Sequence, residues 1–189
     1  MELGVAAFFV LSYWLWPGGF ETAYDFVHFG LWLVAGVIMA ILLGYDQKWY
    51  LLPDKLNLAL AVIGLAVVAV VSVESNDVGG TLLSALGSVG VLAGLYAALY
   101  VVSRGQWVGF GDVKLGVGLG LLLLDWQLAL AALFLANFIG CLIVIPLMLA
   151  KKLQRHAQIP FGPLLIAGTV IAWLFGPQII AFYLGAFTI

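Results

Sequence analysis

Long apolar runs follow one another along the whole chain, separated by short breaks that contain polar residues, glycine or proline. A helix needs about 20 consecutive apolar residues to cross a lipid bilayer. Of the 189 residues, 65% are hydrophobic and only 8% are charged. A water-soluble domain of this size has no interior large enough to bury so much apolar surface. The pattern therefore predicts an integral membrane protein built from helices.

The apolar runs predict about seven crossings in an all-α, polytopic transmembrane bundle. Their approximate positions are 2–16, 26–45, 56–73, 80–103, 113–124, 126–150 and 161–187. The first and fifth runs are short for a full crossing, so we expect some short or broken helices. No internal repeat or long polar linker divides the chain. We therefore expect one integral membrane domain over residues 1–189.

The positive charges fall on one side of the predicted membrane. All seven Lys and Arg residues lie near the breaks that follow the second, fourth and sixth crossings: Lys48, Lys55, Arg104, Lys114, Lys151, Lys152 and Arg155. The opposite breaks carry only acids. Segments rich in Lys and Arg are retained in the cytoplasm. This side is therefore expected to be cytoplasmic, with the N-terminus inside and the C-terminus outside.

Three acids share the cation-rich side and need an explanation. Asp46 ends the second crossing, where the helix macrodipole disfavours an anion. Asp54 follows a proline directly before an apolar helix, which is the position of an N-cap. Asp112 follows Gly109 and Gly111, which permit an irregular backbone and the close approach of another segment. Such backbone is tolerated at membrane depth only inside protein or beside a wet cavity, so Asp46 and Asp112 are the candidate functional acids.

Three separated stretches carry a family resemblance. They are YDQKWYLLPDKLN at 45–57, GFGDVKL at 109–115 and IPFGP at 159–163. Together they resemble the type IV prepilin peptidases, membrane aspartyl proteases of the GxGD class, over essentially the whole chain. The resemblance implies that Asp46 and Asp112 are the catalytic pair. The expected supporting residues around the pair are Gly109, Gly111, Asp54 and Lys114.

The resemblance also implies a substrate and a location. The expected reaction removes the basic leader from prepilin-like precursors, either type IV pilins or the pseudopilins of type II secretion. It would take place at the cytoplasmic face of the bacterial inner membrane. Two neighbouring carboxylates share one proton, so one serves as general base on a water and the other as general acid. We expect no metal or organic cofactor, and no nucleic-acid partner; the partners are the precursor and the bilayer.

The cysteine count departs from the family. Bacterial members commonly carry a cytoplasmic domain with two Cys-x-x-Cys pairs that accompanies N-methylation, whereas this chain has the single cysteine Cys141. We therefore expect a peptidase domain without a methyltransferase domain, either as a peptidase-only protein or as a piece of a longer one. Cys141 lies in an apolar run and is expected to be a small core residue. His28 and His156 show no metal-ligand spacing.

Small residues and tryptophans support two further predictions. Gly90 and Gly94, like Gly116 and Gly120, are four residues apart, the spacing that lets membrane helices pack closely. Six tryptophans fall mostly near predicted crossing ends, as in an aromatic belt at the membrane surface. They are Trp14, Trp16, Trp49, Trp107, Trp126 and Trp173.

Other functions remain open from the sequence. A small proton-coupled transporter would use Asp46 and Asp112 as a proton relay, because ionisable residues near broken helices also mark transport sites. The missing repeat, and polar residues gathered at one face instead of at mid-membrane, favour the peptidase. A structural assembly subunit would use the acids only as helix caps. Among enzymes, a preflagellin-type or presenilin-like GxGD protease is the alternative, and the Pro-Asp and Pro-Phe-Gly-Pro elements favour the prepilin type.

Overall fold

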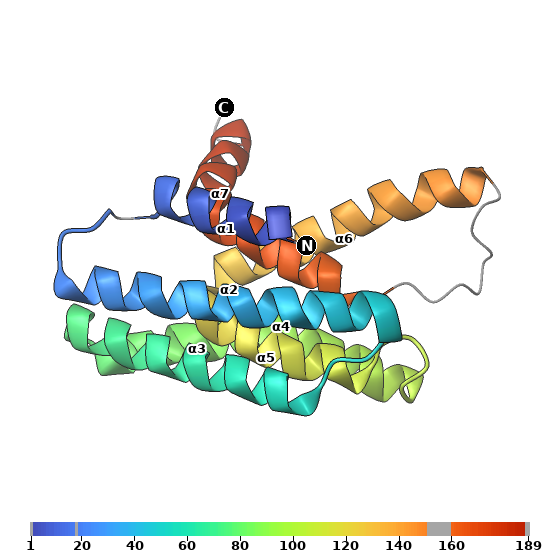
Figure 1. Ribbon diagram of the computed structural model, residues 1–189, viewed down its shortest axis with the longest axis horizontal. Helices are drawn as coiled ribbons and strands as arrows, with labels where there is room; N and C mark the ends of the chain where they lie inside the picture. The colour runs from blue at the N-terminus through green and yellow to red at the C-terminus, as the bar shows by residue number, and fades with distance from the viewer. Residues whose placement is uncertain (1, 18, 151–159, 188–189) are drawn as a thin grey trace.

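The protein is a bundle of seven α-helices in the computed structural model, which describes residues 2–17, 19–150 and 160–187 (Figure 1). The helices are α1 (Glu2–Trp14), α2 (Ala23–Trp49), α3 (Asp54–Ser75), α4 (Val78–Ser103), α5 (Phe110–Leu123), α6 (Trp126–Leu149) and α7 (Gly162–Phe187). No strand occurs in these ranges. The predicted all-α bundle is confirmed, and each helix matches a predicted crossing to within a few residues.

Five helices are long and apolar enough to cross a membrane: α2, α3, α4, α6 and α7. The other two, α1 and α5, have 13 and 14 residues, which agrees with the predicted short runs. α5 packs against both α3 and α4, and more than half of its residues are buried. Because protein surrounds it, α5 does not need the full length of a lipid-exposed crossing.

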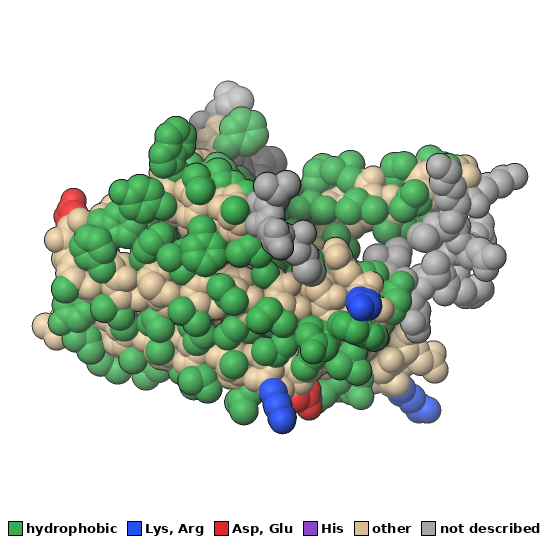
Figure 2. Space-filling view, viewed as in Figure 1, with side chains coloured by type: hydrophobic (Ala, Val, Ile, Leu, Met, Phe, Trp, Pro, Cys, Tyr) green, Lys and Arg blue, Asp and Glu red, His purple; other side chains and the backbone are tan. Residues whose placement is uncertain are grey.

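The two ends of the bundle differ in charge. The C-terminal ends of α2 and α4 and the N-terminal ends of α3 and α5 meet at one end, on the right in Figure 1. The described cations lie there: Lys48, Lys55, Arg104 and Lys114. Figure 2 shows the visible Lys and Arg side chains toward this end, while apolar side chains cover the flank. Three further predicted cations lie outside the described residues: Lys151, Lys152 and Arg155.

One of the two predicted glycine pairs makes a close helix contact. A Cβ on Gly116 would lie 3.1 Å from the Cα of Ala93, and one on Gly120 would lie 2.8 Å from the Cα of Val89. These neighbours are backbone atoms of α4, so α5 approaches α4 more closely than a side chain would allow. Cβ atoms on Gly90 and Gly94 would meet no described atom within 4 Å. The packing prediction is therefore confirmed for the pair on α5 and wrong for the pair on α4.

We predict that Gly120→Ala lowers the free energy of unfolding by about 1–3 kcal/mol, because the new methyl group overpacks a backbone contact. The gain in helix propensity of about 1 kcal/mol opposes this loss and does not cancel it. Gly90→Ala is the matched control and should leave stability unchanged or slightly raised. Denaturation in mixed micelles measures both. Equal stability of the two variants would contradict the close approach of α4 and α5.

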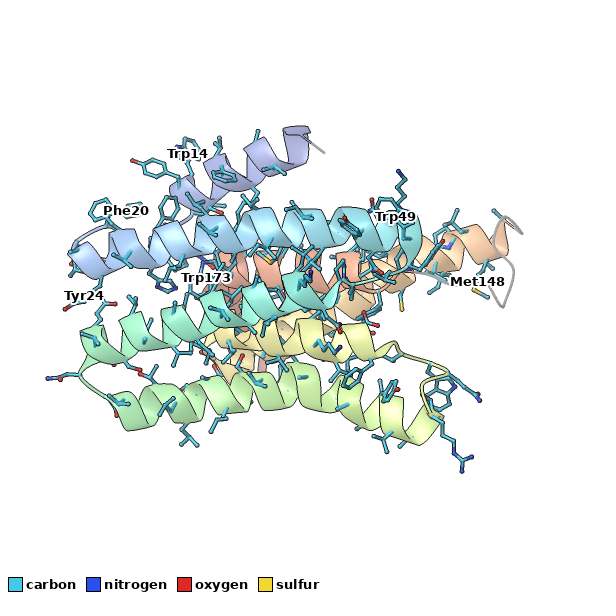
Figure 3. All side chains as sticks on the ribbon, turned by 60° about the horizontal axis from the view of Figure 1, so that its bottom comes forward. Trp14, Phe20, Tyr24, Trp49, Met148 and Trp173 are labelled. Carbon is cyan, nitrogen blue, oxygen red and sulfur yellow. The ribbon has the colours of Figure 1, made fainter. Side chains whose placement is uncertain are left out.

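Two predictions about burial are wrong. Trp16 and Trp173 are only 8% and 9% exposed, and both pack in an aromatic cluster with Trp32 and His28 instead of forming a surface belt. In Figure 3, Trp173 lies within the bundle, whereas Trp14 and Trp49 lie on its outer side. Cys141 is exposed on α6. Apolar residues of a membrane helix face lipid as readily as protein, so an apolar run does not report which of its members are buried.

Candidate functional site

A cavity of about 1090 Å³ lies at the cation-rich end of the bundle. Its lining comes from the ends of α2, α3 and α5, from the C-terminal part of α4 and from the middle of α6. The segments that lead into α3, α5 and α7 complete it. Asp46, Asp54 and Asp112 all line it. Pockets for small ligands typically have about 300–1,000 Å³, so this cavity has room for a short peptide segment. The fold thus brings together the three acids that the sequence singles out.

Asp46 lies in the last turn of α2 and is only 6% exposed. The negative end of the α2 macrodipole disfavours a carboxylate at this position. The compensating contact comes from α7, whose first residue, Gly162, donates its backbone N–H to Asp46 Oδ2 at 3.0 Å. The N-terminus of a helix is a favourable site for an anion. Asp46 is therefore held at the junction of two helix ends that lie 116 residues apart in the chain.

Asp112 lies in the first turn of α5, and its Oδ2 accepts the backbone N–H of Gly109 at 3.2 Å. Gly109 is the extended N-cap residue, with φ −75° and ψ 148°. The three-residue spacing is that of a capping box, in which an acid of the first turn reaches back to the cap. Gly111 is helical, and its lack of a side chain makes room for Leu52. A Cβ on Gly111 would lie only 3.1 Å from the Cβ of Leu52. Of the two predicted roles for these glycines, extended backbone therefore applies to Gly109 and close approach to Gly111.

The two carboxylates interact electrostatically across the cavity. Asp112 lies ahead of the predicted crossing over 113–124 and outside the five long apolar helices. Partial burial, together with the negative charge of Asp46, raises the pKa of Asp112 to about 6, while the hydrogen bond from Gly109 opposes the rise. A carboxyl group with this pKa is suited to exchange protons near neutral pH.

Asp54 does not cap α3 as predicted. The N-cap residue is Pro53, no side chain caps this helix, and Asp54 is its first helical residue. The Asp54 carboxylate instead accepts a hydrogen bond from Lys114 Nζ at 2.6 Å, as one half of an ion pair. Lys114 also lies over the ring of Phe110, 4.9 Å from its centroid. Asp54 and Lys114 therefore form an ion pair on the wall of the cavity. Lys114 thus has a structural contact in addition to its place among the cations that mark the predicted cytoplasmic side.

Several cavity residues have no predicted role, among them Tyr96, Asn137 and Phe161. Asn137 carried a usable signal, because an amide in a helix whose mean hydropathy reaches 2.7 is expensive unless it faces a polar space. Phe161 lies within the IPFGP stretch, which contributes to the family resemblance, but the sequence predicts no role for Phe161 itself. Tyr96 gave no signal, since tyrosine is common near membrane interfaces.

The arrangement suits proton transfer to and from a bound molecule. Two carboxylates from different helices face one cavity, and one of them has a raised pKa. Such a pair can activate a water and protonate a leaving group. Among the described residues, no three His, Cys, Asp or Glu side chains are grouped as metal ligands would be. Catalysis without a cofactor stays a prediction.

Comparison with known proteins gives one family. A model of the type IV leader peptidase family matches residues 32–145, a segment that contains Asp46 and Asp112. The prepilin leader peptidase/N-methyltransferase of Aeromonas hydrophila is 33% identical over 150 residues, which cover 79% of this chain and 51% of that protein. The protein of the same name from Legionella pneumophila is 30% identical over 177 residues, covering 93% of this chain and 59% of the relative.

A shorter relative also matches. The leader peptidase HopD of Escherichia coli is 29% identical over 138 residues, which cover 72% of this chain and 87% of that protein. By contrast, the chain spans about half the length of the prepilin leader peptidase/N-methyltransferases it matches. No solved structure matches the chain.

Proposed function

The chain belongs to the type IV leader peptidase family, and we propose that it is an aspartic endopeptidase that removes the leader from prepilin-like precursors. Asp46 and Asp112 are the catalytic pair in this proposal. The observation that carries it is the convergence of these two acids, from separate helices, on one cavity at the cation-rich end. Residues of the long apolar helices α2, α4 and α6 line part of the cavity, which suits a substrate with a hydrophobic stem.

In the proposed reaction the two carboxyl groups share one proton. The ionised group takes a proton from a water molecule, whose oxygen attacks the carbonyl carbon of the scissile peptide bond. The protonated group donates a hydrogen bond to the carbonyl oxygen and later supplies a proton to the leaving amine as the C–N bond breaks. Positioned acid–base groups of this kind accelerate a reaction about 10²–10⁴-fold. The two carboxyl groups titrate as a unit, so the resting proton belongs to the pair.

The charges around the cavity support a substrate with a basic leader. Asp54 is 74% exposed and its partner Lys114 is 34% exposed, so their ion pair is accessible from the cavity. Exposed ion pairs of this kind contribute only about 0–1 kcal/mol. A Lys or Arg of the leader can therefore replace Lys114 as the partner of Asp54 at small cost. We propose that Asp54 contacts the leader while the hydrophobic stem stays in the bilayer.

We further propose that residues 1–189 form a peptidase domain in the bacterial inner membrane, with the cavity open to the cytoplasm. The one-sided distribution of the described cations supports this orientation. The proposal includes no N-methylation, because this chain has one cysteine and therefore no Cys-x-x-Cys pair.

The test is cleavage by the purified protein in proteoliposomes of a precursor with a short basic leader and an apolar stem. Mass spectrometry should find a single cut between the leader and the stem. A precursor whose leader cations are replaced by Gln is the matched control, and it should be cut more slowly at the same site. Proton flux into the vesicles without any cleavage would overturn the peptidase proposal in favour of a proton-coupled transporter.

A further inference from the structure

Tyr96 of α4 carries a buried hydroxyl group that the fold leaves unused. The side chain is 3% exposed, and its Oη has no hydrogen-bond partner among the residues that the structure describes. Buried polar groups almost always have a partner, because an unpaired one loses its bonds to water and gains nothing in return. An exception on a cavity wall points to a molecule that binds in the cavity.

The nearest polar group on α6 does not satisfy this hydroxyl. Asn137 is near enough to Tyr96 for the two side chains to interact, but no hydrogen bond to the Tyr96 Oη forms at bonding distance. The Asn137 amide nitrogen donates instead to the backbone carbonyl of Leu133, one turn earlier on α6, at 2.8 Å. Within the described part of the chain, the Tyr96 hydroxyl therefore keeps an unused donor beside the cavity.

The position of Tyr96 relates it to the acid pair. Tyr96 lines the same cavity as Asp46 and Asp112, and Asp112 is close enough to act on the phenol electrostatically. The ring packs against Phe161, with 5.2 Å between the ring centroids. The next residue, Gly162, is the one whose N–H holds Asp46. The first residue of α7 and the residue before it thus support a carboxylate of the pair and the tyrosine ring, respectively.

We propose that Tyr96 is a catalytic residue whose hydroxyl group donates a hydrogen bond to the carbonyl oxygen of the scissile peptide bond. The inference rests on the proposed peptidase function. When the water oxygen bonds to the carbonyl carbon, the π electron pair of the C=O bond moves onto the carbonyl oxygen. The Tyr96 hydroxyl and the protonated carboxyl group then stabilise the developing oxyanion from two directions, and the tyrosine keeps its own proton throughout. A donor that is fixed in place before the substrate arrives stabilises this charge more than a mobile water does.

The test is Tyr96→Phe, which removes the hydroxyl group and keeps the ring against Phe161. Because removal of one oxyanion donor typically costs about 10²–10³-fold in kcat, we expect a loss of that size for precursor cleavage in proteoliposomes, with KM within about threefold of wild type. The unpartnered hydroxyl predicts that the variant unfolds at the same temperature as wild type or higher. Tyr100→Phe is the matched control: Tyr100 lies one turn later on α4, packs on Phe110 and does not line the cavity. It should keep wild-type kcat.

The possible results separate the claims. Cleavage by Tyr96→Phe at the wild-type kcat would overturn the role of Tyr96 and leave the peptidase proposal standing. A rise in KM alone, or a loss of activity matched by a fall in unfolding temperature, would also overturn it, because either result indicates substrate binding or a structural role. If the wild-type protein cuts no precursor, the peptidase proposal fails and the role of Tyr96 fails with it.

Discussion

Replacing either Asp46 or Asp112 with asparagine is expected to lower kcat for precursor cleavage at least about a thousand-fold, since an amide neither accepts nor supplies the transferred proton. The double variant should be no slower than the slower single variant, because residues that act as one unit give strongly non-additive losses. Single-turnover cleavage in proteoliposomes measures all three variants.

These substitutions should leave the fold intact. An asparagine at position 46 keeps an oxygen that can accept the N–H of Gly162, and one at position 112 keeps an acceptor for Gly109. Asp77→Asn is the matched control, because Asp77 caps α4 through the N–H of Gly80 at 2.8 Å and lies at the opposite end of the bundle. Asparagine caps helices as well as aspartate does, so this variant should keep full activity. Full cleavage by Asp46→Asn or by Asp112→Asn would refute the catalytic pair.

Gly162→Ala is expected to lower kcat about a hundred-fold or more while the protein stays folded. A Cβ at this position would lie 2.7 Å from Asp46 Oδ2 and 3.3 Å from Leu52 Cδ2. The carboxylate must move away from the methyl group, and it then loses the hydrogen bond from the Gly162 N–H. A displacement of about 1 Å in a catalytic group can cost about 100-fold in rate.

The control for this variant is Gly94→Ala, where the same added methyl group meets nothing within 4 Å. It should cleave at the wild-type rate. Thermal unfolding of both variants separates a displaced carboxylate from a general loss of structure. If Gly162→Ala cleaves as fast as Gly94→Ala, then the start of α7 does not position Asp46.

Much of the fold could be predicted because bilayer crossing is a local property. A helix that faces lipid must satisfy its backbone hydrogen bonds internally and must be about 20 apolar residues long, so the runs in the sequence mark the helices directly. The capping residues agree with this local reading: Asp77 and Asp125 cap α4 and α6, each directly before an apolar run. The one-sided cations are a local signal of the same kind.

Burial could not be predicted in the same way. In this chain an apolar residue faces either lipid or protein, and composition does not distinguish the two. For this reason the predicted environments of Cys141 and Trp173 are wrong. The two glycine pairs have identical spacing, yet only Gly116 and Gly120 meet a neighbouring helix. Which face of a helix packs depends on the helices beside it.

The sequence by itself determined the class of protein, the approximate helices, the separation of charge between the two ends and, through the family resemblance, the proposal of Asp46 and Asp112 as a pair. Only the tertiary structure decided what surrounds those acids. It joins Asp46 to the start of α7, pairs Asp54 with Lys114 and leaves the Tyr96 hydroxyl, on the cavity wall, without a partner among the described residues. The physical reason is range: helix formation and membrane insertion depend on neighbouring residues, whereas each of these contacts depends on how distant helices pack.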